Sequence, residues 1–200
     1  PVPPLALART GDELAGAART ALGAGASALC LKLEDPAVPH KSDVGGVLLG
    51  VGPDEVADAA GDLWRRFPGT PLLVMPMLRR GLELLAGAGT DPDFGPYITI
   101  GRGGVTAELD PDVALAPAPL TPARAHELWS SLRCAPLLAG WRGAPAVDLG
   151  ALAGLAVALG DLAAAHPALT VECNPVIAYA EGFAIADLRA VGEGDRRAGT

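Results

Sequence analysis

The chain has 200 residues, half of them hydrophobic, and a formal net charge of −8 at pH 7. That length suits one medium domain or two small lobes, and it is enough to bury a core without disulfides or metals. The negative charge argues against nucleic acid as the main partner, because binding to a phosphate backbone requires a basic surface. No apolar run reaches the ~20 residues of a membrane span, and the first residues lack the pattern of a signal peptide. The three cysteines are odd in number and widely spaced, which favours reduced core thiols in a cytoplasmic protein.

The first 75 residues alternate between helical and strand patterns, as in an α+β lobe. Thr10 and Glu13 fit a capping box, which marks the start of the first helix. A proline and two acidic residues at 53–55 mark the start of the second helix. The predicted elements are a helix from Thr10 to about Leu22, strands at 29–33 and 46–51, a helix from Pro53 to about Phe67, and a strand at 71–75.

The rest of the chain, residues 76–191, is richer in hairpins and is predicted to form a second lobe. The turn-forming run at 91–95 joins two of its strands. The predicted elements are strands at 82–90, 96–101, near 104–108 and 112–116, a helix from Thr121 to about Arg133, a helix from Asp148 to about Ala165, and a terminal hairpin of 169–179 and 183–187. Residues 192–200 are polar and rich in glycine and arginine, and we expect a flexible tail there.

Lysine occurs only at Lys32 and Lys41, although the chain has 15 residues of the Lys and Arg types. Both lie in the segment LCLKLEDPAVPHKSDVGGV, which has a strand-like run, a loop containing His40, and a glycine pair before another apolar run. Lysine is a compact point charge on a flexible stem and suits contact with a phosphate. On this segment alone, a phosphate-handling hairpin and a chance clustering of lysines are both open.

Three oxygen-bearing side chains gather on the terminal hairpin. Glu172 and Asn174 are two positions apart on one strand and therefore share a face, and Asp187 falls opposite them when the turn lies near Glu181–Gly182. Such a set suits Mg²⁺, which is held by a few protein oxygens together with phosphate and water. The alternative is that Glu172 is solvated, Asn174 starts a turn and Asp187 ends a strand.

Six motifs follow one another along nearly the whole chain: LKLEDPAVPHKSDVGGV, LVMPM, GLELLAGAGTDPDFGP, GRGGV, DVALAPAPLTPARAHEL and VECNPV, with Asp187 after them. In these motifs the sequence resembles the ATP-grasp domain of NDP-forming acyl-CoA synthetases. These are also called acetate–CoA ligases (ADP-forming) and are relatives of the succinyl-CoA synthetase β subunit. HKSDVGGV and E-L-x-x-G-x-x-x-D-P-x-F-G-P are the most specific of the matches. The resemblance implies an ATP-grasp fold, with two α+β lobes and a nucleotide bound between them.

The resemblance also implies roles for individual residues. Lys32 would contact the nucleotide phosphates, and Glu83 would make a polar contact with the nucleotide. The Met75 carbonyl and Met77 N–H would bind the adenine edge at the junction of the lobes. His40 would relay a phosphoryl group to or from a phosphohistidine on a partner domain. Asn174 and Asp187 would hold Mg²⁺, with Glu172 beside them.

Two features depart from the family pattern. Ala116–Pro117 stands where the family often has a basic residue, and the segment 109–112 is unusually acidic. Against the family pattern we also expect the first lobe to lack an N-terminal helix, and we find no sequence pattern of a CoA-binding module or a phosphohistidine domain. The implied function is the Mg-ATP-binding, phosphoryl-transferring part of an acid–CoA ligase (ADP-forming), with ATP or ADP as substrate. It requires CoA-binding and CoA-ligase domains or an α subunit as partner. The alternative is a ligand-sensing regulatory module fused to a GNAT-type acetyltransferase domain. Neither reading predicts a nucleic acid or membrane partner.

Overall fold

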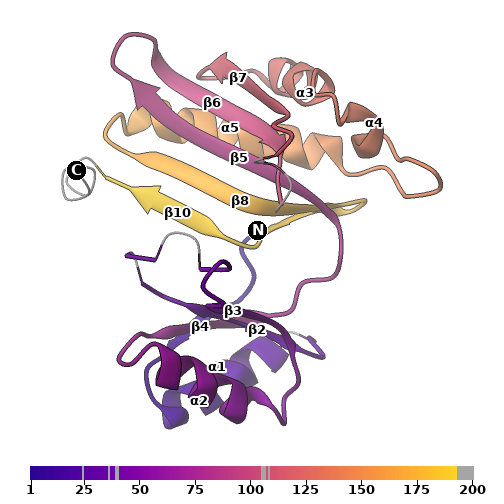
Figure 1. Cartoon of the computed structure of the whole chain (residues 1–200). Helices are drawn as coiled ribbons and strands as arrows, with labels where there is room; N and C mark the ends of the chain where they lie inside the picture. The colour runs from indigo at the N-terminus through magenta and orange to yellow at the C-terminus, as the bar shows by residue number, and fades with distance from the viewer. Residues whose placement is uncertain (24, 36, 39–40, 105–106, 108, 193–200) are drawn as a thin grey trace. The chain divides into compact units, whose positions relative to one another are not determined.

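The structure is a computed structural model of the whole chain, and it describes all residues except 24, 36, 39–40, 105–106, 108 and 193–200 (Figure 1). The chain divides into two compact units. The first unit is Pro3–Arg79, and the second unit is Arg80 onward together with Pro1–Val2. From sequence the division is expected at Met75–Met77, a few residues earlier. Each unit is described by itself.

The first unit is a four-stranded antiparallel sheet with two helices. The strands lie in the order β1-β4-β2-β3, with β2 paired to β4 on one side and to β3 on the other. Its elements are β1 (Ala6–Ala8), α1 (Gly11–Gly23), β2 (Leu29–Leu33), β3 (Val47–Val51), α2 (Val56–Arg66) and β4 (Leu72–Pro76).

Both helices of the first unit pack on one face of its sheet (Figure 1). α1 begins as its sequence predicts, because the Glu13 N–H donates to Thr10 Oγ1 at 3.3 Å and the Glu13 carboxylate accepts from the Arg9 N–H at 2.6 Å. Leu14 of α1 and Leu63 of α2 are buried in the hydrophobic core that the helices share with the strands. The opposite face of the sheet is therefore not part of this core.

The second unit is a larger antiparallel sheet with three helices. The strand order is β10-β8-β5-β6-β7, and β9 also pairs with β8. Its elements are β5 (Leu82–Asp91), β6 (Gly95–Arg102), β7 (Val113–Pro117), α3 (Pro122–Ser130), α4 (Ala135–Leu138), α5 (Leu149–Ala165), β8 (Thr170–Tyr179), β9 (Gly182–Ile185) and β10 (Leu188–Val191).

The core of the second unit lies under α3 and α5. Leu84, Ile98 and Leu152 are completely buried in it, as is Trp129. α3 and α5 begin at residues whose side chains accept a hydrogen bond from the first turn, Thr121 and Asp148, as the sequence predicts. None of the helices in the described part of the chain combines the length and the apolarity that a bilayer crossing requires.

Three features differ from the sequence prediction. β1 and β10 were not expected; each is short, and β10 has three exposed residues among its four, so neither has a strong apolar pattern. The strand expected near 104–108 is not formed at Gly104 or Ala107, where the Ala107 N–H donates to the Gly104 carbonyl in a turn. The helix expected to reach Arg133 ends at Ser130, and the separate α4 follows it.

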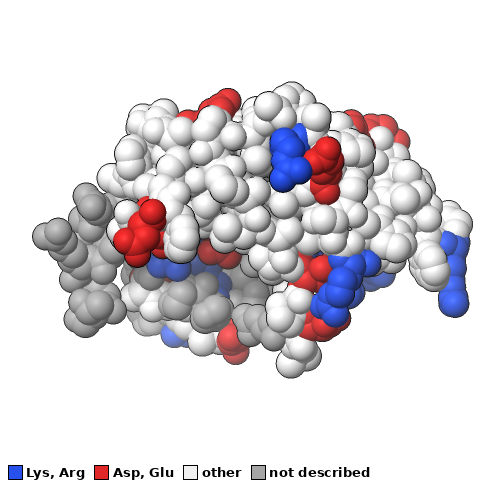
Figure 2. All heavy atoms as spheres, turned by 90° about the horizontal axis from the view of Figure 1, so that it is seen from above, with Lys and Arg blue, Asp and Glu red and all other residues white. Residues whose placement is uncertain are grey.

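Charged side chains are sparse on the face shown in Figure 2, where basic and acidic groups lie side by side. Exposed pairs of this kind include Arg124 with Glu127, one turn apart on α3. The described basic side chains on this face form no continuous basic surface.

Trp129 provides a test of the second unit's core. Its Nε1–H donates to the Leu152 carbonyl at 3.0 Å. Trp129→Phe should lower the free energy of unfolding by about 1–3 kcal/mol, because it removes this donor and leaves a void beside α5. Trp141→Phe, at a ring that is 53% exposed, should change it by less than ~0.5 kcal/mol. Urea denaturation followed by circular dichroism measures both, and equal effects would contradict this role for Trp129.

Candidate functional site

Lys32 lies in the middle of β2, on the sheet face that the helices do not cover. Its neighbours Leu31 and Leu33 belong to the core under the helices, so strand alternation directs Lys32 to the opposite face. In register it lies opposite Val47 of β3 and Leu73 of β4. The residue is only 7% exposed, and a charged group this enclosed is retained where it has a bonded partner. Lys32 is thus enclosed, unlike a typical surface lysine.

The segment Met75–Met77 closes β4, and the structure uses its backbone inside the sheet. The Met77 N–H donates to the Ala28 carbonyl at 2.9 Å, and Met75 lies opposite Cys30 in the same antiparallel pair. Main-chain groups two residues apart on a strand point to the same side, so those of Met75 also face β2. The Met77 N–H, which the resemblance assigns to the adenine edge, is therefore bonded within the sheet in this structure.

Glu83 lies near the start of β5 and beside the turn of the GRGG motif. The Gly103 N–H donates to the Glu83 carbonyl at 3.0 Å. Gly104 has a φ of +84°, and a Cβ built there would overlap a carboxylate oxygen of Glu83. Glycine at 104 therefore makes room for this carboxylate, and the fold brings two motifs that are distant in sequence together.

The terminal strands bring Asn174 and Asp187 together as the sequence predicts. The Asn174 N–H donates to the Asp187 carbonyl at 3.1 Å, at the junction between the pairing of β8 with β9 and its pairing with β10. Glu172 and Asn174 are exposed, whereas Val171 and Cys173, which alternate with them along β8, are buried. The Asn174 amide nitrogen lies 3.5 Å from Glu172 Oε1. The backbone of Asp187 thus lies beside Asn174, and the Asn174 amide lies near the Glu172 carboxylate.

The donor chemistry of this cluster suits a hard divalent cation. Glu172 and Asp187 offer carboxylate oxygens, and Asn174 offers an amide oxygen, which are the ligand types that Mg²⁺ prefers. Across the described residues, no group of three or more His, Cys, Asp or Glu side chains is placed to hold a metal ion. The hairpin cluster has only two such side chains and an amide, and this fits an ion that takes its remaining ligands from phosphate and water.

His40 lies outside the described residues, but the turn that follows it is described. The Gly46 N–H donates to the Lys41 carbonyl at 2.7 Å, and the Gly45 N–H donates to the Ser42 carbonyl at 3.0 Å. Gly45 has a φ of +66°, and a Cβ on Gly46 would lie 2.5 Å from Leu33 Cδ1. Both glycines of HKSDVGGV are therefore required by this turn. The second lysine, Lys41, pairs with Glu34 at 3.2 Å.

The unusually acidic segment 109–112 has a structural role. The Asp112 carboxylate accepts hydrogen bonds from the Arg133 and Cys134 N–H groups at 2.9 and 2.7 Å, and Asp110 pairs with the Arg133 guanidinium at 2.7 Å. Burial alone would raise the pKa of Asp112, but the hydrogen bonds from the Arg133 and Cys134 N–H groups, with the Cys134 side chain and the Arg133 charge, hold the pKa below its ordinary value. These carboxylates thus bind the segment between α3 and α4.

The buried cysteines are not arranged as nucleophiles. Burial raises the pKa of the Cys134 thiol to about 12, and the nearby Asp112 carboxylate adds to this shift. Burial also raises the pKa of Cys173. Because the thiolate is the reactive form, both remain inert thiols near neutral pH. The expectation of free core thiols is confirmed, since all three cysteines are free and buried.

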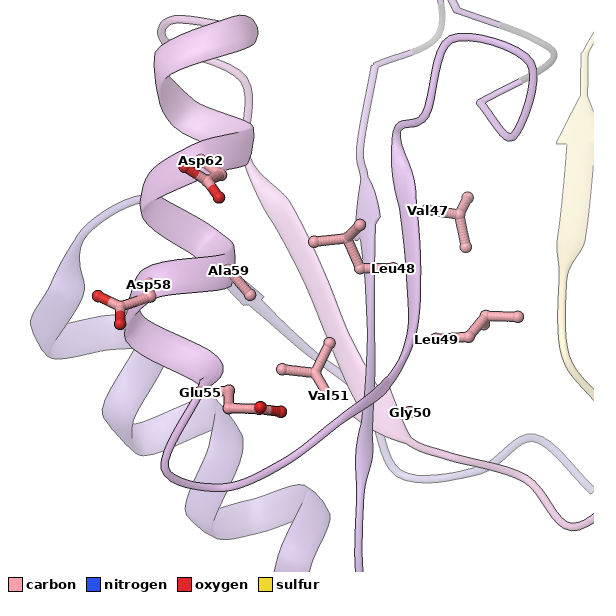
Figure 3. A pocket seen from close by; sticks show the side chains of 9 residues that line it. All are labelled: Val47, Leu48, Leu49, Gly50, Val51, Glu55, Asp58, Ala59 and Asp62. Carbon is pink, nitrogen blue, oxygen red and sulfur yellow. The ribbon is translucent and has the colours of Figure 1, made fainter.

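A groove that the sequence does not predict lies between β3 and α2 (Figure 3). Leu48 and Val51 point toward α2, whereas Val47 and Leu49 point to the other side of the sheet. The groove has a volume of about 700 Å³ and is lined by Val47, Leu48, Leu49, Gly50, Val51, Glu55, Asp58, Ala59 and Asp62. Its charged lining is acidic, so it is unsuited to phosphate, and none of the predicted site residues lies in it.

The chain is similar to known proteins along most of its length. The ATP-grasp domain family matches residues 1–191. Acetate–CoA ligase [ADP-forming] I of Archaeoglobus fulgidus is 36% identical over 198 residues, which cover 95% of this chain and 28% of that protein. The β subunit of acetate–CoA ligase [ADP-forming] I from Pyrococcus furiosus is 33% identical over 176 residues, which cover 80% of this chain and 73% of the subunit. The chain therefore spans little more than a quarter of the first relative and most of the second.

Solved structures of one synthetase are similar over almost the whole chain. The dinucleotide forming acetyl-coenzyme A synthetase 1 of Ca. Korarchaeum cryptofilum, in complex with coenzyme A, Ca-AMPCP and HgCl⁺, has a TM-score of 0.88 at 32% identity, covering 96% of this chain and 86% of that chain. Its selenomethionine derivative with coenzyme A and Mg-AMPPCP, in which a phosphohistidine segment points towards the nucleotide binding site, has a TM-score of 0.81 at 30% identity, covering 96% and 85%. The predicted α+β, ATP-grasp fold is thereby confirmed.

Asp112 provides a pH-dependent test of the segment it binds. Because the pKa of Asp112 is lower in the folded chain than its ordinary 3.8, the ionised group stabilises the fold above about pH 4, and this stabilisation is lost as the pH falls through the folded-state pKa. Asp112→Asn should lower the free energy of unfolding at pH 7 by about 1–3 kcal/mol, since buried N–H groups lose a charged acceptor.

Urea denaturation at pH 7 and pH 3 measures this effect. The difference between Asp112→Asn and the unsubstituted chain should shrink at the lower pH. The control is Asp110→Asn, at an exposed ion pair, which should change stability by less than ~1 kcal/mol. A difference that stays constant with pH would show that the Asp112 charge is not what matters.

Proposed function

The chain belongs to the ATP-grasp domain family, and we propose that it is the Mg-ATP-binding, phosphoryl-transferring part of an ADP-forming acyl-CoA synthetase. The overall reaction converts a carboxylate, CoA and ATP to acyl-CoA, ADP and phosphate. The observation that carries this proposal is the match to a ligase β subunit along 73% of that subunit's length. The grouping of Asn174 with Asp187 adds support from the structure.

In this proposal the first unit supplies Lys32 to the nucleotide phosphates. Its enclosed position in β2 means that little side-chain freedom remains to be lost on binding. The segment Met75–Met77 also contacts the nucleotide, but its backbone is engaged with β2. Adenine recognition by the Met77 N–H would require that bond to Ala28 to open. Glu83, held beside Gly104, makes a polar contact with the nucleotide.

The second unit supplies the metal-binding residues in this proposal. Asn174, Asp187 and Glu172 would hold Mg²⁺, which when bound neutralises charge on the phosphates. The protein's own contribution is position: the bond from the Asn174 N–H to the Asp187 carbonyl keeps these two residues adjacent. Catalysis of phosphoryl transfer then rests on alignment and electrostatics.

His40 is proposed to accept and donate the phosphoryl group, since an imidazole is a competent nucleophile. The receiver is a histidine on a CoA-binding and CoA-ligase partner, present as further domains or as an α subunit; it becomes a phosphohistidine as the phosphoryl group leaves His40, and ATP is released as ADP. Support comes from the β-subunit relative and from the synthetase structure with a phosphohistidine segment. The two units would correspond to the ATP-grasp lobes, and the protein would act in the cytoplasm.

The alternative, a regulatory module of a GNAT-type acetyltransferase, gains no support from the comparisons. The relatives described above are ligases and synthetases. The acidic segment that departs from the family pattern also does not argue for it, because Asp112 and Asp110 are engaged by Arg133 and its neighbour.

Nucleotide binding is the first test. Mg-ATP at ~100 times its dissociation constant should stabilise the fold by about 2.7 kcal/mol, visible as a shift in thermal melting that disappears with EDTA. Lys32→Arg should weaken binding by about tenfold or more, because an arginine fork does not replace an enclosed point donor to phosphate. Arg79→Lys, at an exposed position, is the control and should bind normally. No shift at millimolar Mg-ATP would contradict the proposed binding.

The transfer step is tested at His40. His40→Ala should leave Mg-ATP binding within about twofold but should lower acyl-CoA-dependent ATP formation at least ~100-fold with the partner supplied, because the group acts in the chemical step. Asp187→Ala should impair both binding and transfer. Full activity of His40→Ala in the presence of the partner would show that this residue is not the relay.

A further inference from the structure

The guanidinium of Arg66, at the C-terminal end of α2, reaches back to the turn that follows His40. Its Nη2 donates to the Val44 carbonyl at 2.6 Å, and its Nη1 donates to the Gly45 carbonyl at 3.2 Å. The same group lies over the Phe67 ring, 5.1 Å from its centre. One side chain thus grips two successive carbonyls more than twenty residues away in sequence.

The glycine in this turn leaves room for the Arg66 guanidinium. A Cβ on Gly45 would lie 2.8 Å from Arg66 Nη2, so only glycine leaves room for the guanidinium. Ser42, Asp43 and Val44 are exposed, so apolar packing does little to fix the turn. Arginine suits the contact because its planar fork offers parallel donors, whereas lysine offers a single point of charge.

We propose that Arg66 is a positioning residue for phosphoryl transfer, acting through the turn Lys41–Gly46. The inference rests on the proposed function, in which His40 immediately precedes this turn. The turn also sets the end of β2, because the Leu33 N–H donates to the Gly46 carbonyl at 2.9 Å, next to Lys32. Arg66 therefore ties the chain that carries the relay histidine to the rigid helix α2.

Hydrogen exchange and kinetics of two variants test this role. Arg66→Gln should speed exchange of the Gly45 and Gly46 amides by about tenfold, the effect of losing roughly one charge-assisted hydrogen bond from the closed turn. With the CoA-binding partner supplied, it should lower kcat about tenfold or more, as expected when a reacting group is misplaced. The dissociation constant for Mg-ATP should change less than about twofold, since Lys32 is held by its strand. Arg66→Lys should give exchange rates and a kcat between those of Arg66→Gln and those of the unsubstituted chain.

Arg65→Gln is the matched control, because Arg65 is the preceding exposed arginine of α2 and pairs with Asp62 of the same helix. It should alter neither exchange nor kcat. Gly45→Ala should speed exchange at least as much as Arg66→Gln, because a Cβ there both crowds the guanidinium and strains the left-handed backbone of the turn. Thermal melts of each variant show whether the fold is retained.

The possible failures can be told apart. If the unsubstituted chain transfers phosphoryl with its partner and Arg66→Gln does so at the same kcat, the positioning role is wrong and the proposed function stands. Unchanged exchange at Gly45 and Gly46 in Arg66→Gln would also overturn the positioning role. If the unsubstituted chain transfers no phosphoryl group with the partner, the proposed function fails, and the role of Arg66 fails with it.

Discussion

Each unit of this protein is an antiparallel sheet with helices on one face only, and the candidate site depends on that asymmetry. A strand alternates its side chains between two faces. In β2 the leucines enter the core under α1 and α2, and Lys32 is left on the other face. In β5 Leu82 and Leu84 face the core, and Glu83 does not. In β8 the same alternation separates Val171 and Cys173 from Glu172 and Asn174. The strands therefore place their polar side chains on the face that the helices do not cover, and the hydrophobic core on the other face is not interrupted.

Sequence patterns predict this arrangement well where the alternation is strong. β2 and α5 have the expected bounds within a residue, because one is an apolar run interrupted only by Lys32 and the other begins at a capping aspartate. The pairing of Asn174 with Asp187 is also foreseeable, since it requires only a turn near Gly182 and the known spacing of strands. Short edge strands escape prediction. β1 and β10 are formed because a neighbouring strand offers unpaired main-chain groups, and this information lies elsewhere in the chain.

Other parts of the site could not be predicted because they depend on contacts between distant segments. The bond from the Met77 N–H to Ala28 follows from the register of β2 against β4, and a single strand pattern does not specify register with a partner. In the sequence Asp112 resembles a surface charge. Its role depends on the Arg133 and Cys134 N–H groups, which follow the end of α3 and donate to its carboxylate. Gly104 gains its meaning from the carboxylate of Glu83, which is about twenty residues away in sequence.

Arginine and lysine, the two basic residue types of this chain, serve different purposes in the structure. Arg66 holds two carbonyls and Arg133 holds the carboxylate of Asp110 and the Pro111 carbonyl, and both tasks suit a planar group with several donors. Lys32 lies in β2, opposite Val47 and Leu73 in register, and it is only 7% exposed. An arginine-rich composition can therefore replace lysine on the surface and in loop contacts. At Lys32, enclosed in its strand, we expect the compact charge of lysine to matter instead.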